Sequence, residues 1–288
     1  MINFDPSSLY PYQPIIDRPS IKWPNGARVA VWVVPNIEHF HIDLFPAPPD
    51  VRNFARRDYG NRVGIWRLME TLAKHGVRGT VALNSEVCRH YPRIIEEATK
   101  LKWEFMGHGT TNSITLSGLD KDIEENIIVE TKRAIEGVGH GMKGWLGPGL
   151  QETWNTLDLL KKHGVEYVAD WVHDDLPVRM TNGLYSIPYT LELNDMPLFN
   201  NPSISIQDFQ QRICDAFDVL YAEGAKCARA MCIALHPFLI GAPHRIKYLD
   251  QAIQYIASHQ HVWFATGQEI IAAYRDQEKV HASAVPSA

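Results

Sequence analysis

The sequence predicts an α/β protein with a parallel sheet, open or closed into a barrel, in a single domain. Short apolar segments alternate with segments of helical periodicity from residue 28 to about residue 270, and this alternation is typical of strand–helix units around a parallel sheet. No change of composition marks a second domain, and 288 residues is an ordinary length for one α/β barrel.

The chain begins with an expected arm, a strand and a loop. Residues 1–27 are rich in Pro and Tyr and lack periodicity, so we expect them to wrap the domain. Arg28–Val34 is a nearly continuous apolar run, as in strands buried on both faces. Residues 43–58 contain Pro46, Pro48 and Pro49 and are expected to form a long loop.

The remaining elements follow from periodicity. Helices are predicted over 61–75, 205–223 and 243–259. The first places Trp66, Met69 and Leu72 on one face and ends before Gly76, a residue typical of helix C-termini. Short apolar strands are expected at 79–83, 103–106, 143–146, 166–169, 184–187, 230–235 and 262–264. The domain is therefore expected over 28–277, followed by a flexible tail at 278–288.

Composition excludes several classes of protein. The net charge is −5, and Lys and Arg do not gather into a run, so no nucleic-acid partner is expected. No apolar stretch approaches the roughly 20 residues that span a bilayer, and the N-terminus does not resemble a signal peptide. The four cysteines form no CxxC pair, which favours reduced core thiols and a cytoplasmic location, without membrane partners.

Polar and titratable residues recur after the expected strands. In parallel α/β folds, functional sites lie at the carboxyl ends of the strands, so these residues are expected to converge. They are Asn36, Glu38 and His39 after the first strand, His108 and Asn112 after 103–106, Gly147–Gly149 after 143–146, Asp170 and Trp171 after 166–169, and His236 after 230–235.

These segments resemble, in order, the five motifs of the polysaccharide deacetylase superfamily, carbohydrate esterase family 4 with its NodB homology. The matching blocks are Asn36–His39, His108–Asn112, Gly147–Gly149, Ala169–Trp171 and Ala234–Pro237. The resemblance covers roughly residues 28–270 and implies a distorted (β/α) barrel with about seven parallel strands.

Three further blocks resemble the allantoinase-like branch of that superfamily, which includes cyclic imide hydrolases. They are Tyr59–Gly64, Asp174–Pro177 and Pro188–Asp195. The resemblance implies a hydrolase of C–N amide bonds in a small cyclic amide, such as a cyclic imide, allantoin or a related ureide. Relatives of this type form tetramers, so the resemblance also implies a homo-oligomer.

The metal motif of the superfamily is altered here. The family holds its metal with an Asp and with two His in His-x-x-x-His, but the second His is replaced by Asn112, and the Asp position falls on Glu38 or His39. Asn is a poor zinc ligand. Either no cofactor is required, or a divalent metal such as zinc is held by Glu38, His39 and His108. The Arg of the third motif is also missing, with Pro148 near its place.

Amide hydrolysis requires an activated water, a stabilised oxyanion and a proton for the leaving nitrogen. We expect Glu38 to be the general base, with a pKa raised towards neutrality by apolar surroundings. His236 is the expected proton donor or oxyanion partner. His108 is expected to position the water, or to bind a metal.

The remaining candidates are expected to bind the substrate. Asn36, Asn112 and Asp195 offer hydrogen bonds to the carbonyl and N–H edge of a cyclic amide. Trp171 and Tyr189 offer aromatic faces that could stack on or enclose the ring. Asp170 follows its strand directly and is included in the same group.

Other interpretations stay open at this point. His236 could be a hydrogen-bonded core histidine, and Asp170 could simply accept backbone hydrogen bonds. The alternative activity is N-deacetylation of an amino sugar or polysaccharide, and the altered metal motif and missing export segment oppose it. A further alternative is a non-catalytic barrel that binds a ligand, which the retained Glu38 and His236 oppose.

Overall fold

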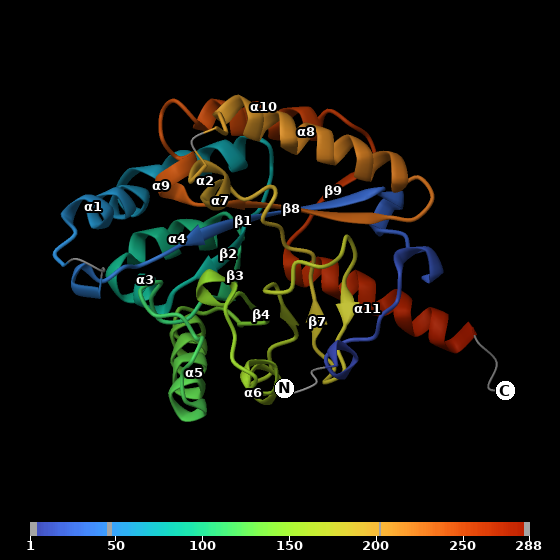
Figure 1. The fold of residues 1–288 in the computed structure, drawn as a ribbon. Coiled ribbons are helices and arrows are strands. Elements are labelled where there is room, and N and C mark those ends of the chain that lie inside the picture. The colour runs from blue at the N-terminus through green and yellow to red at the C-terminus, as the bar shows by residue number, and fades with distance from the viewer. Residues whose placement is uncertain (1–4, 45–47, 202, 285–288) are drawn as a thin grey trace.

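The computed structural model describes residues 5–44, 48–201 and 203–284 (Figure 1). Within these ranges the strands form one sheet in the order β6-β7-β5-β4-β3-β2-β1-β8, and β9 pairs with β1 as well. The strands are β1 (Val29–Ile37), β2 (Thr80–Leu83), β3 (Glu104–Gly107), β4 (Gly144–Trp145), β5 (Tyr167–Val168), β6 (Val178–Arg179), β7 (Tyr185–Ser186), β8 (Arg229–Leu235) and β9 (Val262–Phe264).

The sheet is an incompletely closed barrel, which confirms the predicted fold class. Every pairing is parallel except that of β6 with β7. Beyond the outer edge of β8, backbone hydrogen bonds from Ala230 to Asp175 (2.9 Å) and from Ala234 to Leu193 (3.0 Å) replace a further strand. Because loops close this gap, the barrel is distorted there.

Strand β1 is the centre of the sheet and is buried along its whole length. It pairs with β8 from Val29 to Pro35 on one edge, while its other edge pairs first with β9 and then, at Asn36 and Ile37, with β2. With neighbouring strands on both edges and both faces buried, β1 needs the apolar run that the sequence provides.

Helices surround the sheet, with α8 and α10 side by side over one face (Figure 1). The helices are α1 (Val51–Tyr59), α2 (Ile65–Lys74), α3 (Ser85–His90), α4 (Pro92–Lys100), α5 (Lys121–Gly137), α6 (Thr156–Lys162), α7 (Asp195–Phe199), α8 (Ile206–Glu223), α9 (Pro237–Ile240), α10 (Ile246–Ala257) and α11 (Gly267–Ala284). Helix α8 begins with a capping box between Ser205 and Asp208, and none of the described helices is long and apolar enough to cross a membrane.

Two predicted segments differ from the structure. The expected loop at 43–58 contains α1, whose N-cap Asp50 accepts a hydrogen bond from the backbone of Asn53 at 3.0 Å. The three prolines before it suggested a loop, although Val51, Phe54 and Ala55 form a short apolar stripe on α1. The expected helix at 61–75 is a π-helical turn, η5 (Gly60–Gly64), followed by α2. Met69 and Leu72 are buried as predicted, but Trp66 is 36% exposed.

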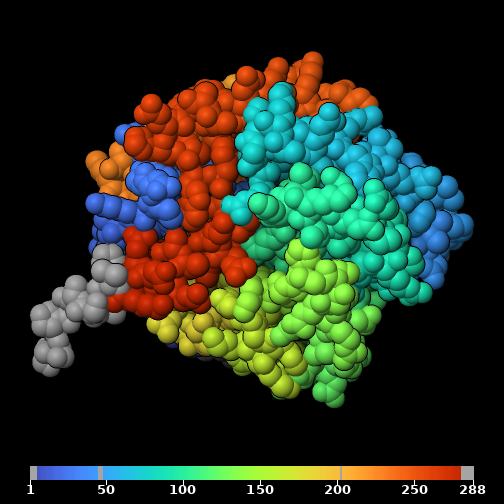
Figure 2. Space-filling view, turned by 180° about the vertical axis from the view of Figure 1, so that it is seen from behind, coloured from blue at the N-terminus to red at the C-terminus, as the bar shows by residue number. Residues whose placement is uncertain are grey.

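The segment before β1 packs against β8 and the C-terminal helix α11. Trp23 donates to the carbonyl of Arg229 at 2.6 Å, and Lys22 exchanges hydrogen bonds of 2.6 Å with Gln277 of α11. Figure 2 shows the N-terminal segment in blue beside the C-terminal part in red. Helix α11 continues to Ala284, so residues 278–284 are helical and the predicted tail began too early; residues 285–288 lie outside the described ranges.

The four cysteines are free, as predicted for reduced thiols. Only Cys232 is fully buried, and Cys88, Cys214 and Cys227 are half-buried, so the prediction that all four belong to the core was wrong.

The segment η5 packs tightly against α9. A Cβ atom on Gly64 would lie 2.0 Å from the carbonyl oxygen of Pro237, and one on Gly60 would lie 2.8 Å from the backbone nitrogen of Phe238. Because the opposing atoms belong to the backbone, they cannot rotate away. This contact sets the position of the segment that follows β8.

We expect Gly64→Ala to lower the free energy of unfolding by about 3 kcal/mol, since the added methyl group overpacks a rigid contact. Urea denaturation measures the change. The matched control is Gly137→Ala at the end of α5, where a Cβ meets nothing within 4 Å, and it should change stability by no more than about 1 kcal/mol. Equal stability of the two variants would contradict the proposed packing constraint.

Candidate active site

Glu38 lies at the centre of a buried group at the carboxyl ends of the strands. It directly follows β1, His108 follows β3 and His236 follows β8, so the parallel register brings the three side chains to one edge. The residues are 7%, 2% and 6% exposed, respectively. The structure thus brings together the three residues that the sequence analysis named as catalytic.

Two imidazoles flank the carboxylate of Glu38. Its Oε1 lies 3.6 Å from Nε2 of His108 and 3.6 Å from Nε2 of His236, distances longer than direct hydrogen bonds. Asn112 donates to the same oxygen at 2.5 Å. The other oxygen, Oε2, is buried and has no hydrogen-bond partner, so it is free to accept a proton from a bound water.

Asp195 holds His236 in place. Nδ1 of His236 lies 2.7 Å from Oδ1 of Asp195, and the backbone N–H of His236 donates to both carboxylate oxygens at 3.0 and 2.9 Å. Asp195 is completely buried. The predicted role of Asp195 in contacting substrate therefore differs from the structure, in which Asp195 orients the imidazole and leaves its Nε2 facing Glu38.

His108 has a defined tautomer. Its Nδ1 lies 2.5 Å from the carbonyl oxygen of Leu146, which can only accept a hydrogen bond, so Nδ1 carries the proton. Its Nε2 is buried without a hydrogen-bond partner. This atom lies 3.6 Å from Oε1 of Glu38, so it can help to hold a bound water beside the carboxylate.

The charges of Glu38 and His236 stabilise each other. Burial raises the pKa of Glu38, but the attraction of His236 and contacts with His108 together outweigh burial and lower it to about 2. Burial lowers the pKa of His236, but the carboxylates of Glu38 and Asp195 outweigh burial and raise it to about 10. The expectation of a raised pKa for Glu38 was wrong, because the two imidazoles lower this pKa by more than burial raises it. At neutral pH the pair is a carboxylate and an imidazolium.

The Tyr59–Gly64 block holds the backbone of the segment that carries Glu38. Asn61 of η5 donates to the backbone carbonyl of Glu38 at 2.8 Å, and Arg67 donates to the hydroxyl of Tyr59 (2.6 Å) and the carbonyl of Gly241 (3.0 Å). The segment thus connects the residues after β1 to those after β8. Sequence reasoning used this block only to recognise a resemblance.

Asp170 and Glu152 form a second pair of carboxyl groups, and both residues are half-buried. Asp170 accepts a hydrogen bond from the backbone of Gly147 at 2.7 Å, so the backbone-bonding alternative does hold. Burial and then the neighbouring Glu152 raise the pKa of Asp170, and burial raises the pKa of Glu152 to about 7. Sequence reasoning missed Glu152, although it lies in the loop after β4, where site residues are expected.

A cavity of about 710 Å³ opens beside this carboxyl pair. Its lining includes Glu152, Trp154, Trp171 and Leu119. Trp171 donates to Glu152 at 3.1 Å and presents its ring to the cavity, where the sequence analysis expected it to enclose a substrate. Glu38, His108 and His236 do not line this cavity, so it is distinct from the group around Glu38.

Asn36 and Tyr189 lie in the core below the site. The amide of Asn36 donates to the carbonyls of Val34 and Leu235 at 3.3 Å and to the hydroxyl of Tyr189 at 3.5 Å. Tyr189 is 5% exposed and packs edge-on against Trp32. These contacts support the strands, and substrate contact by either residue stays a prediction.

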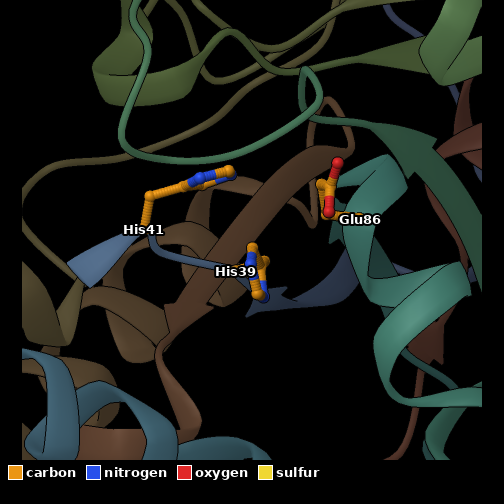
Figure 3. Close-up of side chains that lie close together, drawn as sticks. All are labelled: His39, His41 and Glu86. Carbon is orange, nitrogen blue, oxygen red and sulfur yellow. The ribbon is translucent and has the colours of Figure 1, made fainter. Parts of the chain in front are cut away.

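The predicted metal set of Glu38, His39 and His108 is not brought together. Consecutive side chains of an extended segment point to opposite sides, so Glu38 turns towards His108 while His39 turns towards α3. Among the described residues, the group of His, Cys, Asp or Glu side chains with metal-binding spacing is His39, His41 and Glu86 (Figure 3). The residues at the catalytic edge therefore do not fit a three-ligand metal ion.

Polar atoms without partners gather at the catalytic edge and next to it. Among the described residues, buried atoms without a hydrogen bond include Glu38 Oε2, His108 Nε2, Asn112 Oδ1 and Asp170 Oδ2. Buried polar atoms are normally paired, so this concentration indicates a place where a polar molecule binds.

Comparisons with known proteins agree with this architecture. A family model described as polysaccharide deacetylase matches residues 57–168. A Schizosaccharomyces pombe protein named "Putative polysaccharide deacetylase" is 28% identical, and the match covers 88% of this chain and 92% of the S. pombe protein.

Two solved structures have nearly the same fold. A structure described as a "probable Polysaccharide deacetylase" from Pseudomonas aeruginosa is 29% identical with a TM-score of 0.83, covering 91% of this chain and 95% of its own. A structure of Puue allantoinase is 28% identical with a TM-score of 0.82, and the match covers 90% of this chain and 94% of the allantoinase chain.

We expect Asp195→Asn to lower the pKa of His236 by about 1 to 3, because the variant removes a negative charge in direct contact with the imidazolium. NMR titration of the His236 ring measures this pKa. Asp174→Asn is the matched control, since Asp174 pairs with Arg18 rather than with His236. An unchanged His236 pKa in the Asp195 variant would contradict the role given to Asp195.

Proposed function

Because this chain carries a polysaccharide deacetylase domain and is a hydrolase of C–N bonds other than peptide bonds, we propose that it opens small cyclic amides, such as a cyclic imide, allantoin or a related ureide. The observation that carries the proposal is the buried carboxylate of Glu38 between two imidazoles, with Asn112 donating to it. The allantoinase similarity over nine-tenths of the chain supports it.

The protonation states suit the reaction. Glu38 is ionised at neutral pH and can take a proton from water, while His236 is protonated and can give one to the leaving nitrogen. The unpartnered Nε2 of His108 can hold the attacking water beside Glu38. Asp195 keeps His236 oriented and stabilises its charge.

Hydrolysis of the amide requires no reactant other than the substrate and one water. Water oxygen bonds to the amide carbon as Glu38 removes a proton, and the imidazolium of His236 stabilises the resulting oxyanion. The C–N bond then breaks as His236 protonates the nitrogen. Transfer of the proton from Glu38 to His236 restores the starting state, and a cyclic substrate leaves as one open chain.

Access favours a small substrate. The three catalytic side chains are each at most 7% exposed, so a compact planar ring can reach them more readily than a long polymer. The second candidate, N-deacetylation of an amino sugar, has support from the family model and from the names of the relatives. Asn112 opposes a metal-dependent form of it, since its amide nitrogen is bonded to Glu38.

Incubation with succinimide, hydantoin, dihydrouracil, allantoin and chitin oligomers, followed by mass spectrometry, tests the substrate class. A product heavier by one water from a cyclic compound supports ring opening and identifies the ring. Loss of acetyl from the oligomers alone would replace this proposal with N-deacetylation.

On the substrate so identified, Glu38→Gln should lower kcat by at least about a hundredfold, because glutamine cannot accept the proton of water. Steady-state kinetics measure the loss. Glu97→Gln, which changes a half-buried carboxylate on α4 bonded to Lys100, should retain wild-type activity. A Glu38 variant within a few-fold of wild type would rule out Glu38 as the base.

A further inference from the structure

We propose that His39, His41 and Glu86 bind one zinc-like transition metal ion at a site separate from the catalytic edge. His39 and His41 come from the segment after β1 and Glu86 from α3 (Figure 3). This inference does not depend on which amide the chain hydrolyses.

The donor atoms are close enough for shared coordination. One ligand atom from each residue lies within 4.8 Å of the others. Donors around a tetrahedral zinc ion lie roughly 3.3 to 3.8 Å apart, so side-chain shifts of about 1 Å complete the site. Two imidazoles and one carboxylate are a donor set that zinc accepts, with a fourth position left for water.

His39 is prepared for this role by its surroundings. Its Nδ1 is buried and has no hydrogen-bond partner, which leaves a lone pair without an obvious use in the fold. An imidazole nitrogen with a free lone pair is the form in which histidine binds a metal ion.

Glu86 is oriented by a neighbour. Its Oε2 lies 2.8 Å from Nε2 of His90, one helical turn later, and the His90 ring stacks on that of His39 with 4.6 Å between centroids. The other carboxylate oxygen is left for an ion. A residue that hydrogen-bonds a ligand and fixes its direction is a common support of metal sites.

The backbone beneath the ligands is held by neighbouring elements. The backbone N–H of His39 donates to Asn84 Oδ1 and that of His41 donates to Ser113 Oγ, each at 2.9 Å. The backbone N–H of Glu86 donates to the carbonyl of Thr110 at 3.1 Å. The backbone that carries the ligands is thus held in place before binding, and only the side chains need to move. A bound ion would link the segment carrying Glu38 to α3, so we expect it to stabilise the fold.

The experiment uses full-length protein treated with a chelator and then dialysed against zinc chloride. Metal content by mass spectrometry should reach one zinc per chain. His41→Ala and Glu86→Gln should each weaken zinc binding by at least about tenfold, and Glu86→Gln preserves the size of the side chain and its reach to His90. Circular dichroism verifies that the variants fold.

Controls separate this site from the catalytic edge. His244→Ala removes an exposed histidine elsewhere and should leave binding unchanged, as should His108→Ala. Zinc should raise the Tm of the wild type but not of the His41 and Glu86 variants, and cobalt bound to the wild type should show the visible absorption of a tetrahedral ion. Absence of zinc binding, or zinc lost on changing His108 but retained on changing His41, would overturn the proposal.

Discussion

The burial of three ionisable groups in mutual contact is the constraint on which this site depends. A charge removed from water is costly unless it is paired and hydrogen-bonded. Glu38 and Asp195 approach His236 from opposite sides, and the backbone N–H of His236 adds hydrogen bonds to Asp195. Removal of any one charge would leave another unpaired in the interior, so the three must be considered together.

The stability that this group contributes has a defined pH window. The pKa of Glu38 is lowered from 4.5 to about 2, so its contribution is present above pH 4.5 and is lost as the pH falls through about 2. The pKa of His236 is raised from 6.5 to about 10, so its contribution is complete below pH 6.5 and is lost as the pH rises through about 10. The protonation states needed for catalysis are therefore also those that stabilise the fold.

Much of this arrangement was predictable from the sequence. The apolar run of β1 and the strand–helix alternation predicted a parallel sheet, and a parallel sheet brings the residues after its strands to one edge. This reasoning was sufficient to place Glu38, His108 and His236 together. It could not predict the partner of His236, because Asp195 lies some forty residues earlier and meets it only through the bridge between Asn194 and Ala234.

Other features depend on relations that no periodic pattern contains. The direction of the Glu38 pKa depends on which charges face it, and apolar flanking residues alone suggested the opposite direction. Helix α1 is short and directly follows a proline-rich segment, so the sequence pattern indicated a loop there. The predicted metal set failed because it combined Glu38 with His39, neighbours in sequence whose side chains lie on opposite sides of an extended segment.

Asn112 connects these observations. Its side chain donates to Glu38 Oε1 at 2.5 Å, and its backbone N–H donates to the carbonyl of His39 at 3.0 Å. Thr111 donates to the same carbonyl at 2.8 Å. The residue that replaces the second histidine of the metal motif therefore orients the base on one side of the segment and anchors the backbone of His39 on the other. An amide can do both because it donates a hydrogen bond without carrying a charge, which a third imidazole beside Glu38 would not guarantee.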